Sequence, residues 1–248
     1  MNPFSLQNKT ILVTGASSGI GKAIAITCSQ MGARLIITGR NEIRLLETLN
    51  QLEGEKEHLV FFADMTNEAE LAALIEFIPK LDGIVSNAGI ASPMVLQQMD
   101  EADINKILQI NTLAPINLIR QILQNKKLNK ASSIVFISSI NGNNCSYIGS
   151  TIYASSKAAL NGFAKSLALE LAPREIRVNC INPGMIETEL LQSSAIDEVD
   201  LINDKQKYPL KRYGKPEEVA FATIYLLSDA SKWVTGSSIL IDGGYTLQ

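Results

Sequence analysis

The sequence predicts an α/β protein with a doubly wound, parallel, seven-stranded sheet and helices on both faces. Three observations predict this fold. Short apolar runs rich in β-branched residues alternate with longer segments of helical periodicity along the whole chain. The first apolar run leads directly into a glycine-rich turn and a helix. No linker or change in composition divides the 248 residues, so we expect one domain over 1–248.

The first unit joins a strand at 10–14 to the turn Gly15-Ala-Ser-Ser-Gly-Ile-Gly21 and a helix that runs through Met31. Such a turn exposes backbone N–H groups at a helix N-terminus, where the partial positive charge favours a pyrophosphate. The spacing differs from the G-x-G-x-x-G of many Rossmann-type proteins. A tight turn without a ligand is the alternative, but the order of strand, turn and helix indicates dinucleotide binding.

The second unit is a strand at 33–38, a turn at 39–41 and a helix at 42–52. In a Rossmann-type sheet, the residues after this strand reach the adenosine ribose. Gly39 and Arg40 stand there instead of an acidic residue, and a guanidinium suits a 2′-phosphate. We therefore expect NADP(H) to be preferred, with NAD(H) possible. A solvated turn without such a role is the alternative.

The remaining strands are predicted at 58–63, 81–86, 132–138, 177–181 and 237–241, and the remaining helices at 67–77, 101–127, 152–171 and 216–227. Asn111 and Pro115 inside the 101–127 helix predict a kink. The segment 185–207 is predicted to be a flap. Small or polar residues follow several strand ends, where ligands bind in such sheets: Asp64, Met65, Asn87, Ala88, Gly89, Ser139, Pro183 and Gly184.

Tyr153 and Lys157 stand four residues apart on the 152–171 helix and therefore share one face. A neighbouring positive charge favours a phenolate, so Lys157 is expected to lower the pKa of Tyr153. A phenol tuned in this way can exchange a proton with a carbonyl or hydroxyl oxygen. An ordinary exposed pair on a helix is the alternative.

Composition narrows the function classes. With 46% hydrophobic and 19% charged residues and a net charge of −3, the chain shows no basic excess for nucleic acid or membrane surfaces. Neither a signal peptide nor an apolar run of membrane-spanning length is present, so we expect a cytoplasmic protein. Three scattered cysteines and the single His58 argue against a metal site, and against a Ser-His-Asp triad unless His58 is its base.

Several motifs in this order resemble those of the short-chain dehydrogenase/reductase family across nearly the whole chain. They are Thr14-Gly-Ala-Ser-Ser-Gly-Ile-Gly21, Asn87-Ala-Gly89, Asn111, Ser139, Tyr153-x3-Lys157, Pro183-Gly184 with Thr188, and Asp242-Gly-Gly244. The loop between Ser139 and Tyr153 is one residue longer than the family pattern, which makes Ser138 a rival of Ser139. Ser18 is a second departure, because many NADP-binding relatives have a basic residue there.

The resemblance implies roles for individual residues. Ser139 holds the substrate oxygen, Tyr153 exchanges the proton, Lys157 tunes Tyr153 and binds the nicotinamide ribose, and Asn111 holds a water beside Lys157. Ile186 and Thr188 meet the nicotinamide amide, and Asp64 meets the adenine. The full set expected to contact the cofactor is Gly15, Ser17, Ser18, Gly19, Ile20, Gly21, Arg40, Asp64, Met65, Asn87, Ala88, Gly89, Tyr153, Lys157, Pro183, Gly184, Ile186 and Thr188.

The chain is most similar in appearance to the β-ketoacyl-acyl-carrier-protein reductases within this family, which implies a role in fatty acid biosynthesis. The alternatives are an NAD(P)-dependent alcohol, polyol or sugar dehydrogenase and, in another class, a non-catalytic dinucleotide sensor. The resemblance also implies a homotetramer paired through the 101–127 and 152–171 helices. Lys126, Lys127, Lys130 and Arg174 are expected to form a basic patch near the active-site mouth that docks an acidic carrier, although solvated helix ends would explain them equally.

Overall fold

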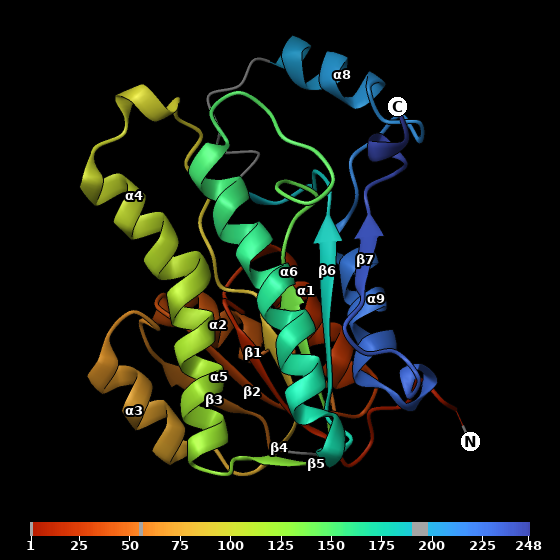
Figure 1. Cartoon of the computed structure of the whole chain (residues 1–248). Coiled ribbons are helices and arrows are strands. Elements are labelled where there is room, and N and C mark those ends of the chain that lie inside the picture. The colour runs from red at the N-terminus through yellow and green to blue at the C-terminus, as the bar shows by residue number, and fades with distance from the viewer. Residues whose placement is uncertain (1, 55–56, 190–197) are drawn as a thin grey trace.

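All strands lie in one parallel sheet, with the order β3-β2-β1-β4-β5-β6-β7 (Figure 1). The computed structural model describes residues 2–54, 57–189 and 198–248. The strands are β1 Thr10–Thr14, β2 Arg34–Gly39, β3 Leu59–Phe62, β4 Leu81–Ser86, β5 Leu128–Ile137, β6 Arg177–Pro183 and β7 Ser238–Ile241. The order reverses between β1 and β4, so the predicted doubly wound architecture is confirmed.

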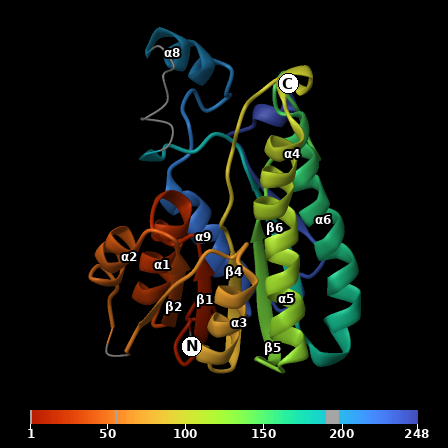
Figure 2. The ribbon, with the colours of Figure 1, turned by 90° about the vertical axis from the view of Figure 1, so that its left-hand side faces the viewer.

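Helices cover both faces of this sheet (Figure 2). The α-helices are α1 Gly19–Gln30, α2 Glu42–Leu49, α3 Glu68–Phe77, α4 Glu101–Leu108, α5 Ala114–Gln124, α6 Thr151–Leu171, α8 Glu198–Gln206 and α9 Pro216–Leu227. Shorter helical turns are η1 Leu96–Gln98, η2 Gln109–Leu113, η3 Ala172–Arg174, η4 Asp229–Ser231 and η5 Tyr245–Leu247. No helix in the described part of the chain is long and apolar enough to cross a membrane.

Alternate residues of each central strand belong to two separate cores. Ile11 and Val13 of β1 pack with α1 and α9, whereas Leu12 between them packs with α3, α5 and α6. Side chains of a strand point alternately to the two faces, and both faces are covered here, so both sets are apolar. This double burial is why the strands appear in the sequence as continuous apolar runs.

The predicted 101–127 helix is three elements rather than one. Between α4 and α5, the turn η2 is a π-helix, and Asn111 lies in its middle. A π-helical turn inserts a bulge into an α-helix, which is one of the recognised causes of a helix kink. The predicted interruption is therefore confirmed, and helical structure ends at Gln124 rather than at 127.

Two other segments differ from the expected boundaries. Strand β5 begins at Leu128, four residues before the predicted start, and its register against β4 shifts between Leu81 and Gly83. Ala131 has φ 59°, so the polar segment that opens β5 is an irregular strand without an apolar pattern. The predicted flap 185–207 contains α8, and residues 190–197 of that prediction lie outside the described residues.

Candidate active site

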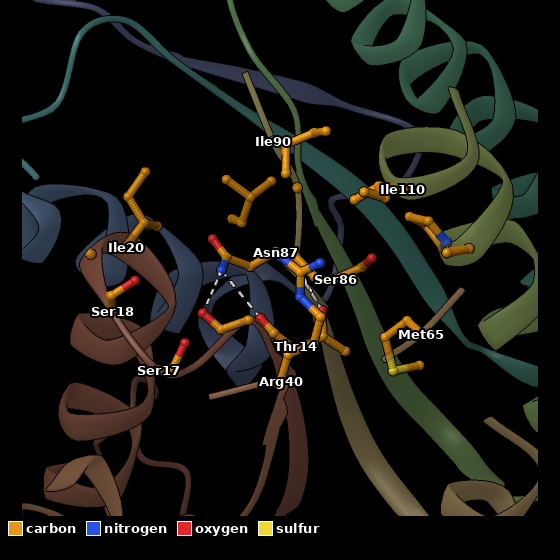
Figure 3. Close-up of a pocket in the computed structure, with 18 of the residues that line it drawn as sticks. Thr14, Ser17, Ser18, Ile20, Arg40, Met65, Ser86, Asn87, Ile90 and Ile110 are labelled. Carbon is orange, nitrogen blue, oxygen red and sulfur yellow. Dashed lines mark hydrogen bonds between the residues drawn. The ribbon is translucent and has the colours of Figure 1, made fainter. Parts of the chain in front are cut away.

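A cavity of about 810 Å³ lies beyond the carboxyl ends of β1, β2, β4 and β5. The structure brings together at this cavity most of the residues expected to hold the cofactor: Gly15, Ser17, Ser18, Gly19, Ile20, Arg40, Asp64, Met65, Asn87, Ala88, Gly89, Tyr153, Lys157 and Thr188. Figure 3 shows Asn87 between Ser17 and Ser18 on one side and Met65 and Ile110 on the other. The cavity is large enough for a dinucleotide, and it spans the reversal point of the sheet.

The glycine turn is fastened to the end of β4. The Thr14 hydroxyl accepts hydrogen bonds from the N–H groups of Asn87 and Ala88 at 3.0 and 3.1 Å. The Asn87 amide donates in return to the carbonyls of Thr14 and Gly15 (Figure 3). Gly15 has φ +64°, and a Cβ there would lie 2.8 Å from Ala88 Cα. Glycine is therefore required at this position for the turn to pack against the end of β4. The turn leads into the N-terminus of α1, which favours a pyrophosphate.

The end of the cavity beside β2 and α2 contains two guanidinium–carboxylate pairs. Arg40 Nη1 lies 3.7 Å from Asp64 Oδ2, and Arg44 Nη1 lies 3.2 Å from Glu189 Oε2. Burial by itself would raise the pKa of Asp64, but hydrogen bonds from Thr66 and the charge of Arg40 lower it below its ordinary value. Asp64 is therefore a carboxylate at neutral pH.

Arg44 and Glu189 line the cavity but were not predicted from the sequence. The available signal for Arg44 was its position, one helical turn after Arg40 at the start of α2. Glu189 directly follows Thr188, and nothing in its spacing indicates a contact with α2.

Ser138 and Ser139 have different partners, which separates the two rival serines. The Ser138 hydroxyl donates to the Lys157 carbonyl at 2.8 Å and accepts from Asn161 Nδ2 at 2.8 Å. The Ser139 hydroxyl instead accepts from the Asn141 N–H at 3.1 Å and acts on the Tyr153 phenol, whose pKa it lowers. Ser139 is thus the serine that acts on the phenol, whereas Ser138 is the one of the two that lines the cavity.

The expectation that Lys157 lowers the pKa of Tyr153 is wrong for this structure. Burial raises the pKa of Tyr153 above its ordinary value, and the hydrogen bond with Ser139 offsets that rise only in part. Burial also lowers the pKa of Lys157 to about 8. Lys157 Nζ lies 6.0 Å from the centre of the Tyr153 ring and donates to the Ile137 carbonyl at 3.0 Å. Burial of both groups decides the direction of the two pKa shifts, and this burial could not be predicted from the sequence.

Asn111 lies behind the cavity wall and does not line it. Its amide oxygen accepts from the Ile90 N–H at 2.8 Å, and its Nδ2 donates to the Ile90 carbonyl at 2.9 Å and to Ser156 Oγ at 3.1 Å. A Cβ on Gly89 would lie 3.1 Å from Asn111 Oδ1 and 3.3 Å from Lys157 Nζ. Gly89 thus lets Asn111 and Lys157 approach the same point.

Other expected cofactor residues also lie outside the lining of the cavity. A Cβ on Gly21 would collide with the Gly15 carbonyl oxygen, so this glycine allows α1 to pack against the turn. Pro183 is buried at the end of β6. A Cβ on Gly184 would lie 3.1 Å from Asp242 Cα. The Ile186 side chain belongs to the core, and its backbone forms a β-bridge with Gly214, while Thr188 reaches the cavity.

His58 has a structural environment away from the cavity. Its Nδ1 accepts a hydrogen bond from the Leu35 N–H at 3.1 Å, and its Nε2 lies 3.1 Å from the Glu53 carbonyl oxygen. Both ring nitrogens are thereby occupied by backbone groups near the start of β3, at the opposite end of the sheet from Tyr153. His58 is therefore not the base of a triad at this site.

The basic patch is not at the active-site mouth of its own protomer, so that expectation is corrected. Lys126, Lys127 and Lys130 lie at the beginning of β5, whereas Ser139 follows its end. Arg174 follows the C-terminus of α6, and Tyr153 lies near its N-terminus (Figure 1). The 21 residues of α6 correspond to about 30 Å. Lys130 pairs with Glu175 at 3.0 Å, and Arg174 Nη2 donates to the Leu128 carbonyl at 2.8 Å.

Sequence comparisons agree with this arrangement. A family model described as "Enoyl-(Acyl carrier protein) reductase" matches residues 15–246. The chain is 38% identical to the 3-oxoacyl-[acyl-carrier-protein] reductase FabG of Rickettsia felis over 96% of this chain and 97% of that protein. It is 35% identical to the FabG of Thermotoga maritima over 98% and 99% of the two chains. It is also 36% identical to Nodulation protein G of a Rhizobium species, over 98% and 99%.

Solved structures of the same fold cover the whole chain. A dehydrogenase/reductase from Sinorhizobium meliloti superposes with a TM-score of 0.89 at 31% identity, covering 98% of this chain and 97% of that one. A short-chain type dehydrogenase/reductase from Mycobacterium marinum superposes with a TM-score of 0.89 at 31% identity, covering 100% and 99%. Together with the cavity, the glycine turn and the Tyr153–Lys157 helix, these matches establish that the chain belongs to the short-chain dehydrogenase/reductase family and is an oxidoreductase that uses a nicotinamide dinucleotide.

Proposed function

We propose that this chain is an NADPH-dependent 3-oxoacyl-acyl-carrier-protein reductase, which converts a β-ketoacyl thioester to the corresponding secondary alcohol. The observation that carries the proposal is the position of Tyr153 and Lys157 in the lining of a cavity of dinucleotide size, with Ser139 acting on the Tyr153 phenol. The printed names of the relatives from Rickettsia felis and Thermotoga maritima support this choice of substrate.

In this proposal the bound cofactor supplies the hydride, and the protein positions the substrate and manages one proton. Ser139 holds the carbonyl oxygen through a hydrogen bond. Tyr153 donates its phenolic proton to that oxygen as negative charge develops on it. The raised pKa of Tyr153 suits this direction, because it keeps the phenol protonated at neutral pH. Lys157 binds the nicotinamide ribose, and Asn111 orders a water beside the Lys157 amine.

The proposed preference for NADPH rests on the end of β2. Gly39 offers no carboxylate to the ribose hydroxyls, and Arg40 lines the cavity beside it. The Arg40 side chain is 62% exposed, and its contact with Asp64 is long at 3.7 Å. Arg40 is thus free to turn toward a phosphate without losing a strong ion pair. Tighter binding of NADH than of NADPH in a fluorescence titration would contradict this preference.

The reaction is tested by following NADPH oxidation with a β-ketoacyl thioester, simple ketones and keto-sugars. We expect the β-ketoacyl thioester to be turned over most efficiently. Tyr153→Phe should lower kcat by about 10²–10⁴-fold, the usual contribution of general acid–base catalysis. Faster reaction with an alcohol, polyol or sugar substrate would replace the proposed substrate. Full NADPH binding with no turnover of any substrate would favour the dinucleotide sensor.

We propose further that the protein is a homotetramer with two kinds of two-fold interface. One is the outer face of α6, where Ser155, Ala159, Gly162 and Ser166 form a stripe of small exposed residues that ends at Leu169, which is 79% exposed. The other surrounds β7, where Trp233 is fully exposed and Phe221 and Leu240 are also exposed. We also propose that the protein is located in the cytoplasm. Its three cysteines, Cys28, Cys145 and Cys180, are free thiols, which is typical of proteins in this reducing compartment.

Carrier docking by the basic patch is compatible with this assembly, and we keep it as part of the proposal. If α6 pairs antiparallel with its copy, Arg174 of one protomer approaches the end of α6 that carries Tyr153 in its partner. Lys130→Glu combined with Arg174→Glu should then slow reduction of the acyl carrier thioester, with a larger loss at low salt. The same acyl group on a small neutral thiol is the control and should react normally. Equal losses with both substrates would exclude this docking surface.

A further inference from the structure

The end of the cavity beside β2 and α2 contains one more cation than the sequence motifs explain. Arg40 and Arg44 both line it, one turn apart around the N-terminus of α2. Ser18, on the opposite wall, contributes a neutral hydroxyl, and its side chain makes no capping hydrogen bond with α1. The two walls are close together, because a Cβ on Gly39 would lie 3.7 Å from Ser17 Oγ. A ligand group held between the walls would therefore meet its positive charge on the α2 side alone.

The first turn of α2 fixes the position of Arg44. The Asn41 side chain caps the helix by accepting from the Arg44 N–H at 3.0 Å. Leu45, the next residue, is fully buried, and its Cδ1 would lie 3.4 Å from a Cβ on Gly39. The backbone that carries Arg44 is thus anchored to the end of β2, while its side chain remains 51% exposed on the cavity side.

The Glu189 carboxylate forms an ion pair with the Arg44 guanidinium from across the cavity. Thr188 Cγ2 would lie 3.1 Å from a Cβ on Gly19, so the chain passes directly over the glycine turn before it reaches Arg44. Glu189 Oε2 then lies 3.2 Å from Arg44 Nη1, and its side chain is 60% exposed. A carboxylate and a phosphate monoester present comparable oxygen pairs to a guanidinium, and the dianionic phosphate is the stronger partner. Such an exposed ion pair is weak enough to be exchanged.

We infer that Arg44 is a second binding residue for the 2′-phosphate of the cofactor and that Glu189 competes with that phosphate for the same guanidinium. The inference rests on the proposed preference for NADPH and extends it to two residues outside the family motifs. It means that a cofactor bearing the phosphate displaces Glu189 from Arg44, whereas a cofactor without it leaves the Arg44–Glu189 pair in place.

The test measures binding to the whole protein by calorimetry, with 2′-phospho-ADP-ribose and ADP-ribose as probes. Arg44→Gln should weaken 2′-phospho-ADP-ribose about tenfold, in line with the loss of one charge-assisted hydrogen bond, and leave ADP-ribose unchanged. Glu189→Gln should strengthen 2′-phospho-ADP-ribose about threefold, and this gain should vanish in the Arg44→Gln background. Lys232→Gln breaks an exposed ion pair with Asp229, outside the lining of the cavity, and serves as the matched control.

Each outcome has one meaning. If wild-type protein binds the two probes equally, the NADPH preference fails, and the role of Arg44 fails with it. If wild-type protein and Arg44→Gln discriminate equally while Arg40→Gln does not discriminate, the preference holds and the inference about Arg44 is overturned. If Glu189→Gln strengthens 2′-phospho-ADP-ribose equally with and without Arg44, Glu189 acts through general charge, and the proposed competition is wrong.

Discussion

Ser138 and Ser139 are adjacent in the chain, yet their hydroxyls face different partners, and each substitution has its own expected effect. Ser139→Ala removes the hydroxyl beside Tyr153, so kcat/KM should fall about 10²-fold, as on loss of one oxyanion donor. Ser138→Ala removes the partner of the Lys157 carbonyl and of Asn161, so the free energy of unfolding should fall by about 1–3 kcal/mol. Urea unfolding and initial rates on both variants check this; a catalytic loss confined to Ser138→Ala would reverse the assignment.

Lys157 should contribute a distinctive pH dependence to stability. Burial lowers its pKa to about 8, against an ordinary value of 10.5, so the folded state loses this proton at lower pH than the unfolded state does. The free energy of unfolding should therefore rise between pH 8 and 10.5, relative to a variant without the amine, by at most about 3 kcal/mol. Urea unfolding of wild-type protein and Lys157→Met across this range measures the difference. Parallel curves would show that the amine is not desolvated.

At the scale of single elements, the π-helix η2 places Asn111 where its amide satisfies the N–H and the carbonyl of Ile90. Asn111→Ala leaves both backbone groups without this partner, so the free energy of unfolding should fall by about 2–4 kcal/mol. Asn125→Ala is the matched control, because that exposed amide caps only the end of α5. Its effect should stay within about 0.5 kcal/mol. Equal effects of the two substitutions would show that the Ile90 contact is not stabilising.

Elements that are buried on both faces or punctuated by glycine could be predicted from the sequence. The strands β1, β2, β4 and β6 are buried along nearly all of their length, and the glycine turn follows β1 without an intervening residue. The start of β5 could not be predicted, because Asn129 and Lys130 are polar and Ala131 has a left-handed conformation. Local sequence shows the alternation of side chains but gives no sign of an irregular strand at the sheet end.

The sequence predicted those residues of the site that follow the ends of strands. It did not predict the properties that depend on contacts between elements far apart in the chain. Asn87 and Tyr153 line the cavity, as their motifs and their positions in the chain predict. The pKa directions of Tyr153 and Lys157 could not be obtained, because desolvation depends on how tightly other elements cover the two groups. The contact between Arg44 and Glu189 joins residues far apart in sequence, and no periodicity connects them.

At the scale of the whole molecule, the proposed tetramer makes a prediction about each interface. A Cβ on Gly162 would meet no described atom of its own protomer within 4 Å. Gly162→Arg should therefore leave the protomer folded, and even favour α6 slightly, while it blocks close approach of a second α6. Trp233→Glu should disrupt the surface near β7. Light scattering should report dimers for either substitution and monomers for both together. A wild-type monomer at micromolar concentration would refute the assembly.

The position of His58 has a consequence for how acidity affects this enzyme. Both of its ring nitrogens are engaged with backbone groups far from Tyr153, and burial lowers its pKa below its ordinary value of 6.5. Protonation is therefore resisted in the folded state, so His58 stabilises the fold above pH 6.5, and this contribution is lost as the pH falls below that value. Mild acid should weaken the scaffold while the turnover of molecules that remain folded stays level. Unfolding and initial rates of wild-type protein and His58→Gln, measured between pH 5 and 7, separate the two effects. We expect protonation of the chain's one imidazole to lower the free energy of unfolding and to leave the rate of the reaction unchanged.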